Sequence, residues 1–462
     1  MNEQEELIWQ EIQNKKIRDA KVKALSIITK ILLLFTVASF LFSPCFQLIL
    51  RALVLHNSTH YEKEEFYTRY TIDVYQDMIQ KVNMIALFVA VLCYILFAAK
   101  IINKRKDIKL SAVLSANKNI IPLLLMWLLA IIIPVVTLIR GANEYDLKGH
   151  PYMFESIFSY MLYPTCYFFC GAMLWKSAYK RALLYLLIVS AIPINILFLV
   201  DEWAKKLPFF ISNNKSAVFH NSNHYGYYLA MAIIASLLLF IYEENVFLKV
   251  FNALSAILGI MVLIVNNTLG AYLSVLFVLV AFIIYCFICD RKLILWALLA
   301  LGIFLATTFA LSFKYNTILS SFVKLSSDVG MIASDPLESD SAGSSRWRLW
   351  KGTIKNLPRS PWLGFGVEGL LNTRGIGTPH NELLQYAEFF GIPTMIIYLS
   401  AVLSVFIMVL KMCKSLDKMT LICFCISVGY FVSSMFGVAV YYTTPFFYIF
   451  LGLTYAELLH KS

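Results

Sequence analysis

The sequence predicts an all-α, polytopic integral membrane protein. Of its 462 residues, 60% are hydrophobic and only 15% are charged, whereas an ordinary soluble domain has about 25% charged residues. Apolar runs of about 18 residues or more, each long enough to cross a bilayer as a helix, recur along nearly the whole chain. The net charge of +11 is therefore better explained by basic cytoplasmic loops than by nucleic-acid binding.

The chain begins with a charged segment, residues 1–24, which is acidic first and basic after. A helix lying on the lipid surface and a solvated tail are both compatible with it. Residues 25–313 then contain about nine apolar helices, and a long polar segment follows at 314–381. Residues 382–462 hold the last helices, which makes about twelve in all. The predicted helices are 25–54, 82–101, 119–139, 153–175, 182–200, 224–242, 246–265, 268–289, 293–313, 382–410, 419–436 and 441–459.

Basic residues cluster in alternate short loops, which predicts the orientation of the chain. Cytoplasmic loops carry the excess of Lys and Arg. With a cytoplasmic N-terminus, every short basic cluster falls on the cytoplasmic side, and so does the C-terminus. The segment 314–381 then becomes a large extracytoplasmic loop between helices nine and ten. The clusters are Lys100, Lys104, Arg105, Lys106 and Lys109; Lys176, Lys180 and Arg181; Arg291 and Lys292; and Lys411, Lys414 and Lys418.

The end of this loop carries the residue types that suit chemistry on a phosphate-bearing lipid. His380 directly precedes the tenth predicted helix, and a free imidazole titrates near pH 6.5, as a general base at neutral pH should. A helix-cap or interfacial role for this histidine is the alternative. Arg346 and Arg348 begin a short predicted helix, and the planar guanidinium binds phosphate bidentately. The tryptophans of this stretch suit either headgroup anchoring or stacking on sugars.

Three further features have competing interpretations. Glu388 lies about 12 Å beyond His380 along a straight helix, so we expect it to be a buried partner of a basic residue. The G-x-G-x-x-G of residues 364–369 has no strand before it, which favours a turn beneath the helix over a nucleotide site. Glu338 and Asp340 are the candidate metal ligands, but their Ser/Gly/Asp-rich surroundings favour a flexible stretch.

These residues resemble the signature of the polytopic O-antigen ligases and the related polymerases of surface polysaccharides. That family has H-[N/S/Q]-x9-G-x-x-[G/T/Y] at the end of its large external loop, with an arginine, Leu-Trp, Pro and G-x-G upstream and a glutamate before the late glycine. The matching residues are His380, Asn381, Gly391 and Thr394, with Arg346, Leu349, Trp350, Pro361, Gly364 and Gly366 upstream and Glu388 before the glycine.

The resemblance implies a metal-independent membrane glycosyltransferase of the C-like fold, without a cofactor. It implies that His380 activates the acceptor hydroxyl and that Arg346 holds the diphosphate. An earlier family motif often starts with an arginine; here Asn214 takes that position, and the adjacent Lys215 is its candidate replacement. The expected substrate-binding residues are Arg348, Arg374, Lys215, Asn381 and Glu388.

The predicted function is glycosyl transfer on the outer face of the cell membrane, from an undecaprenyl-diphosphate-linked oligosaccharide to an acceptor sugar hydroxyl. Polymerisation of surface-polysaccharide repeat units is preferred, and ligation of the glycan to a lipid core is the alternative. The expected partners are the lipid-linked donor, a saccharide acceptor, the bilayer and polysaccharide-assembly proteins, with no nucleic acid. A transporter or flippase would carry charges at the midplane of several helices, whereas here they concentrate in one loop. A non-catalytic assembly partner is the third class.

Overall fold

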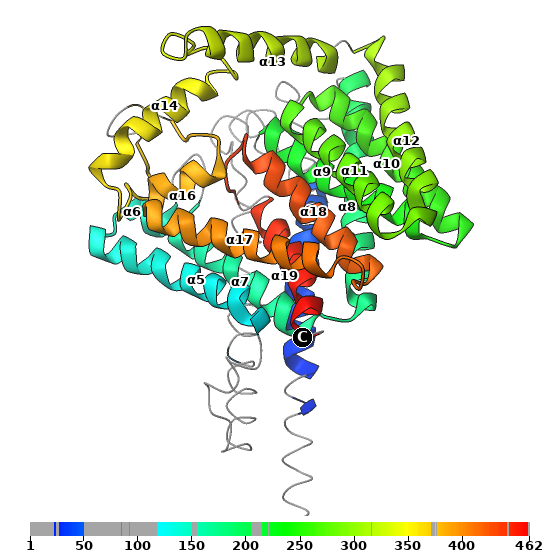
Figure 1. The fold of residues 1–462 in the computed structure, drawn as a ribbon, viewed down its shortest axis with the longest axis horizontal. Coiled ribbons are helices and arrows are strands. Elements are labelled where there is room, and N and C mark those ends of the chain that lie inside the picture. The colour runs from blue at the N-terminus through cyan, green and yellow to red at the C-terminus, as the bar shows by residue number, and fades with distance from the viewer. Residues whose placement is uncertain are drawn as a thin grey trace, which may run out of the picture.

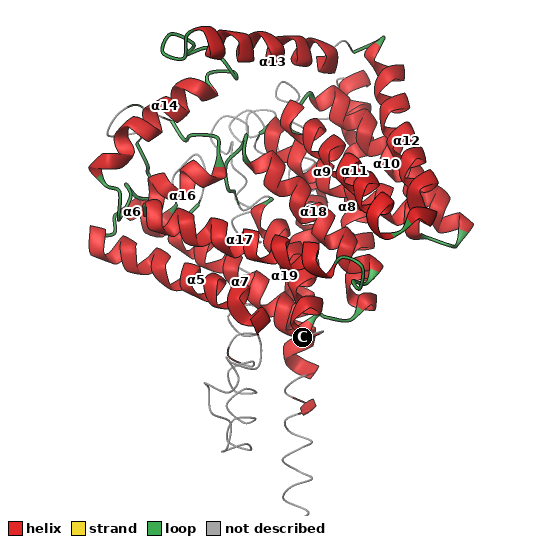
Figure 2. Ribbon diagram, in the orientation of Figure 1, coloured by secondary structure: helices red, strands yellow, loops and turns green. Residues whose placement is uncertain are grey.

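The computed structural model describes most of the chain from residue 118 onward and one N-terminal helix. In these parts every regular element is a helix (Figure 1, Figure 2), so the all-α prediction is confirmed. The segment 1–24, apart from residues 23 and 24, and almost all of the predicted helix 82–101 lie outside the described residues. Apart from a few single residues, the described ranges are 27–49, 118–149, 155–204, 215–219, 221–315, 317–370, 377–440 and 443–460.

Eight of the described helices are long and apolar enough to cross a bilayer, as a polytopic membrane protein requires. Shorter apolar helices accompany them, and each falls on an apolar segment predicted from the sequence. The long ones are Ile27–Ile49, α5 (Ile121–Arg140), α8 (Ser177–Ala204), α9 (Ser222–Tyr242), α10 (Val246–Asn266), α11 (Leu269–Cys289), α12 (Ile294–Ser312) and α17 (Ile392–Met412). The shorter ones are α7 (Ile157–Met173), α18 (Lys418–Ser434) and α19 (Thr444–His460).

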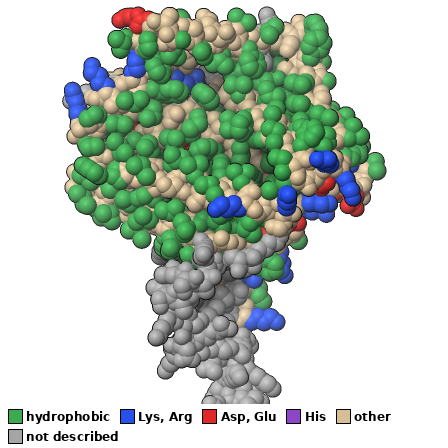
Figure 3. All heavy atoms as spheres, viewed as in Figure 1, with side chains coloured by type: hydrophobic (Ala, Val, Ile, Leu, Met, Phe, Trp, Pro, Cys, Tyr) green, Lys and Arg blue, Asp and Glu red, His purple; other side chains and the backbone are tan. Residues whose placement is uncertain are grey.

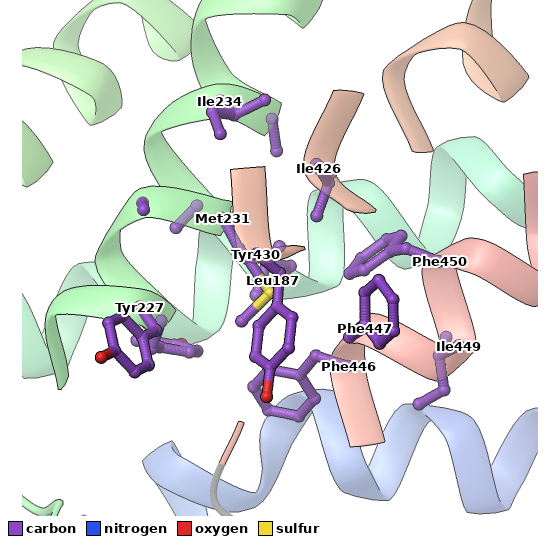
Figure 4. Packing of buried hydrophobic residues seen from close by; sticks show 14 of the residues in the cluster. Leu187, Tyr227, Met231, Ile234, Ile426, Tyr430, Phe446, Phe447, Ile449 and Phe450 are labelled. Atoms are coloured by element: carbon purple, nitrogen blue, oxygen red, sulfur yellow. The ribbon is translucent and has the colours of Figure 1, made fainter. Parts of the chain in front are cut away.

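Helix α9 is the centre of the bundle. It is apolar on all sides and buried along nearly its whole length, as expected of a helix surrounded by other helices. It packs against α8, α10, α11 and α18. Outer helices instead expose large apolar side chains, and hydrophobic atoms cover the middle of the face in Figure 3. Figure 4 shows the core contributed by Tyr227, Met231 and Ile234 of α9, Ile426 and Tyr430 of α18, and Phe446, Phe447 and Phe450 of α19.

The helix ends fall into two groups, as the alternation of basic loops requires. The tip between α10 and α11 meets the segment predicted as the large loop, where Ser321 Oγ donates to Asn267 Oδ1 at 3.1 Å. At the opposite ends of the helices, Lys180 at the start of α8 lies 3.4 Å from Glu457 near the end of α19. The segregation agrees with the predicted helix order, and which end faces the cell exterior stays a prediction.

The segment 314–381 differs from a plain loop. It contains α13 (Thr317–Ser334), which runs across the top of Figure 1 from α12 towards α14 (Arg346–Asn356). The predicted helix 382–410 is also wrong as a single element, because it breaks into α16 (Glu382–Phe390) and α17. Gly391 stands at the break with φ +88°, a conformation that ends a helix and favours glycine.

Candidate active site

Arg346 is fixed by the turn that precedes it and by a distant carbonyl. It is the first residue of α14, after three residues with left-handed backbone, Gly343, Ser344 and Ser345. Its Nη1 donates to the Gly343 carbonyl at 3.1 Å, and its Nε donates to the Phe436 carbonyl at 3.2 Å. Non-glycine residues in this backbone region are strained and cluster at functional sites. The strained turn therefore positions the guanidinium of Arg346 next to the end of α18.

His380 has a left-handed backbone of its own. Its φ is +50°, and it precedes Asn381, the N-cap of α16, so it lies just before the helix, as predicted. Trp350 of α14 holds the preceding residue, since its Nε1 donates to the Pro379 carbonyl at 2.7 Å. This bond gives Trp350 a positioning role, and it explains why Arg346, Trp350 and His380 belong to one motif.

One turn after α18 brings these elements together. Asn381 Nδ2 donates to the Met435 carbonyl at 3.1 Å, while Arg346 Nε donates to the next carbonyl, that of Phe436. Arg346 and Asn381, the residue after His380, are therefore held by consecutive residues. Burial lowers the pKa of His380 to about 4, and the positive charge of Arg346 contributes to the same shift. The imidazole is neutral at pH 7 and can accept a proton.

The G-x-G turn packs directly beneath α16, as predicted. Gly366 N donates to the Phe389 carbonyl at 3.0 Å. A side chain at Gly364 would collide with the backbone of Phe389, and one at Gly391 would collide with the Trp362 carbonyl. The glycines of both motif halves are needed because two stretches of backbone lie in contact.

Residues 254–399 match the model of the O-antigen ligase family. This region is similar to O-antigen ligases. The family resemblance predicted from the motif is confirmed, and the matched region includes both Arg346 and His380. No curated protein matches the chain. Over these residues the chain is similar to the O-antigen ligase family, and its long apolar helices indicate a multi-pass membrane protein.

Glu388 holds two parts of the segment 314–381 in place, and it does not meet a cation within the described residues. It is buried, its Oε1 accepts from the Leu370 backbone N–H at 2.9 Å, and its Oε2 accepts from the Thr353 hydroxyl at 3.0 Å. Burial raises its pKa to about 7. The expectation of a basic partner is wrong because a backbone N–H and a hydroxyl take both oxygens. Its substrate-binding role stays a prediction.

The other predicted substrate-binding residues have different surroundings. Arg348 is exposed on α14. Lys215 has a left-handed backbone, and its carbonyl accepts from Asn266 Nδ2 at 2.8 Å. Both polar atoms of the Asn381 side chain make hydrogen bonds within the protein. Its Oδ1 accepts from the Leu384 N–H at 3.0 Å, and its Nδ2 donates to the Met435 carbonyl. Arg374 lies outside the described residues. Their contacts with substrate stay predictions.

The stretch that contains the candidate metal ligands is held by internal bonds. Asp340 lies 2.6 Å from Lys351 Nζ, and Asp335 caps the turn by accepting from the backbone of Leu337 and Glu338. The described residues contain no cluster of three metal-ligating side chains. Asp340 is thus paired with a cation of α14 rather than with a second ligand.

A clamp between α5 and the glycine turn was missed by the sequence reasoning. Arg140 Nη1 donates to the Phe389 carbonyl at 3.1 Å, and Arg140 Nη2 lies 2.7 Å from Asp146 Oδ2. The other Asp146 oxygen accepts from the Val367 N–H at 3.0 Å. In the sequence Arg140 is only the end of an apolar helix, and the carbonyl of Phe389 that it holds lies more than two hundred residues away. No local signal identified this contact.

Proposed function

We propose that this chain transfers a glycan from an undecaprenyl-diphosphate-linked oligosaccharide to an acceptor sugar hydroxyl on the outer face of the cell membrane. The match of residues 254–399 to the O-antigen ligase family supports a glycosyl-transfer reaction. The observation that carries this proposal is that one turn holds both Arg346 and Asn381, the residue after His380. The charge of Arg346 acts on the imidazole of His380, which is neutral at pH 7. A transfer of this kind needs one base and one cation.

The two side chains divide the reaction between them. His380 accepts the proton of the acceptor hydroxyl as its oxygen bonds to the anomeric carbon of the donor. The bond between that carbon and the diphosphate oxygen breaks, and the lipid diphosphate leaves with its electron pair. Arg346 neutralises the charge that grows on the leaving diphosphate. The proton, the glycan and the leaving group are thereby all accounted for.

Donor binding also adjusts the base. In the free protein, burial and the charge of Arg346 keep the pKa of His380 low. A diphosphate bound to Arg346 offsets that charge, so the pKa of His380 rises towards its ordinary value. A base with a higher pKa takes a proton more readily. The imidazole is therefore a stronger base when the donor is in place.

The acceptor in this proposal is a second lipid-linked repeat unit, which makes the reaction a polymerisation. The test uses purified full-length chain, the lipid-linked repeat as the sole substrate, and a gel that resolves oligomers. A ladder of products supports polymerisation. Product that forms only when a lipid core is added shows ligation instead. A donor that stays unreacted in both mixtures, yet crosses the bilayer of reconstituted vesicles, overturns transfer and favours a flippase.

A further inference from the structure

Tyr227 on α9 has a buried hydroxyl that makes no hydrogen bond within the described structure. The side chain is 1% exposed, and its Oη has no hydrogen-bond partner among the described residues. Figure 4 shows this oxygen pointing away from the aromatic side chains of α19. Buried tyrosine hydroxyls normally find a partner, so an unused one calls for an explanation such as a ligand.

The hydroxyl lies against the turn that holds Arg346. A Cβ at Gly437 would collide with Tyr227 Oη, so the oxygen rests on the backbone of that glycine. The preceding residue, Phe436, is the one whose carbonyl accepts from Arg346 Nε. Tyr227, Arg346 and the residue after His380 therefore reach three consecutive residues, 435–437, from three different elements.

The charges around the hydroxyl agree with this placement. The guanidinium of Arg346 acts electrostatically on Tyr227 as well as on His380. The carboxyl group of Glu382 acts on Tyr227 too, and its Oε2 is another buried oxygen without a partner in the described residues. Glu382 Oε1 accepts from the Tyr398 hydroxyl at 2.9 Å. A hydroxyl within the electrostatic reach of a cation can donate to an anion that the cation attracts.

We propose that the Tyr227 hydroxyl is a second diphosphate-binding group, which donates a hydrogen bond to the phosphate oxygens held by Arg346. The inference rests on the proposed function and adds a residue of the central helix to its site. Donor binding has to shift the turn 435–437 slightly, because this turn covers the hydroxyl. An O–H donor to an anionic oxygen makes a short, charge-assisted bond, which strengthens as the leaving group gains charge.

The test compares the conservative substitution Tyr227→Phe with a matched control, Tyr167→Phe. Tyr167 on α7 is equally buried and also has a hydroxyl without a partner in the described structure, but it stacks on Tyr455 rather than on the turn. The probe is undecaprenyl diphosphate, titrated against the full chain in detergent, with Arg346→Lys as a reference. Turnover and the midpoint of thermal unfolding are measured on the same samples.

Tyr227→Phe should weaken binding of the probe about 10- to 100-fold and slow turnover, as the loss of a hydrogen bond to a charged group predicts. Its unfolding midpoint should not fall, because an unpaired hydroxyl is removed. Tyr167→Phe should bind the probe like the wild type. The inference is overturned if Tyr227→Phe binds the probe like the wild type, or if Tyr167→Phe loses as much binding as Tyr227→Phe. If Arg346→Lys still weakens binding in that case, the proposed function stands. Wild-type binding in all three variants overturns both.

Discussion

The guanidinium of Arg346 acts on the imidazole of His380, although the two residues belong to different elements of the loop. This arrangement depends on the end of α18, where the carbonyl of Phe436 accepts from Arg346 and that of Met435 accepts from the residue after His380. The base and the cation are thus positioned by one piece of backbone. Any change that moves this turn should disturb both.

The pH dependence of activity should reveal the lowered pKa of His380. In the free protein the acid limb of kcat/KM should fall near pH 4, well below the ordinary 6.5 of histidine. The sign for stability follows from the same shift. The unfolded chain takes up the proton first, so the folded state loses stability as the pH falls from about 6.5 to 4. Transfer rates at subsaturating donor, measured from pH 3.5 to 8, test this. An acid limb near 6.5 that disappears in His380→Gln would contradict the environment described.

Two glycines with similar backbone angles should respond differently to alanine. Gly391 has φ +88° and faces the Trp362 carbonyl, whereas Gly141 has φ +91° and nothing within 4 Å of an added Cβ. Both variants meet backbone strain of about 1–2 kcal/mol. Gly391→Ala should add a collision between two main chains and lower the unfolding midpoint much further. The check is thermal unfolding and the yield of inserted protein, and equal losses in the two variants would exclude the packing described.

Glu388, which holds the segment 314–381, should make the stability of the folded protein depend on pH. Its pKa is raised to about 7 by burial, so the folded state holds a proton that the unfolded chain has lost. Stability should therefore fall as the pH rises from about 4.5 to 7, by about 3 kcal/mol for a shift of this size. Glu388→Gln should flatten this part of the unfolding profile. A variant with the same pH slope as the wild type would remove Glu388 as the cause.

Activity should survive chelation of metal ions. The charge of the leaving diphosphate is assigned to Arg346, so transfer by purified protein in EDTA should match transfer without it. Activity that is lost in EDTA and restored by Mg²⁺ or Mn²⁺ would contradict this. Glu338 and Asp340 would then be the residues to test, and the pairing of Asp340 with Lys351 would have to open.

Helices and motif residues could be predicted because their signals are local. Apolar length marks the spans, and the spacing from His380 to Gly391 marks the family motif. The break at Gly391 was missed because the apolar run continues through it, and only the contact with Trp362 shows why the helix must end there. The three-residue turn 435–437 was missed for a different reason. Its residues have no distinctive composition, and their importance lies in which distant side chains reach them.

The partner of Glu388 was mispredicted for a related physical reason. A buried carboxylate predicts a cation when only its own helix is considered. The fold instead supplies the Leu370 N–H and the Thr353 hydroxyl from the loop that folds over α16. Likewise, Arg140 and Asp146 hold the glycine turn through bonds that span about half of the chain. Contacts of this range depend on packing, which no local pattern records.

The most direct test of the central claim is the transfer rate of His380→Ala at saturating lipid-linked donor. Binding of undecaprenyl diphosphate and the level of membrane insertion are measured on the same preparation. If His380 takes the proton of the acceptor hydroxyl, the rate should fall about 10²- to 10⁴-fold. Donor binding and insertion should stay at wild-type levels, because Arg346 keeps its contact with Phe436. A wild-type rate in His380→Ala would contradict the proposed mechanism.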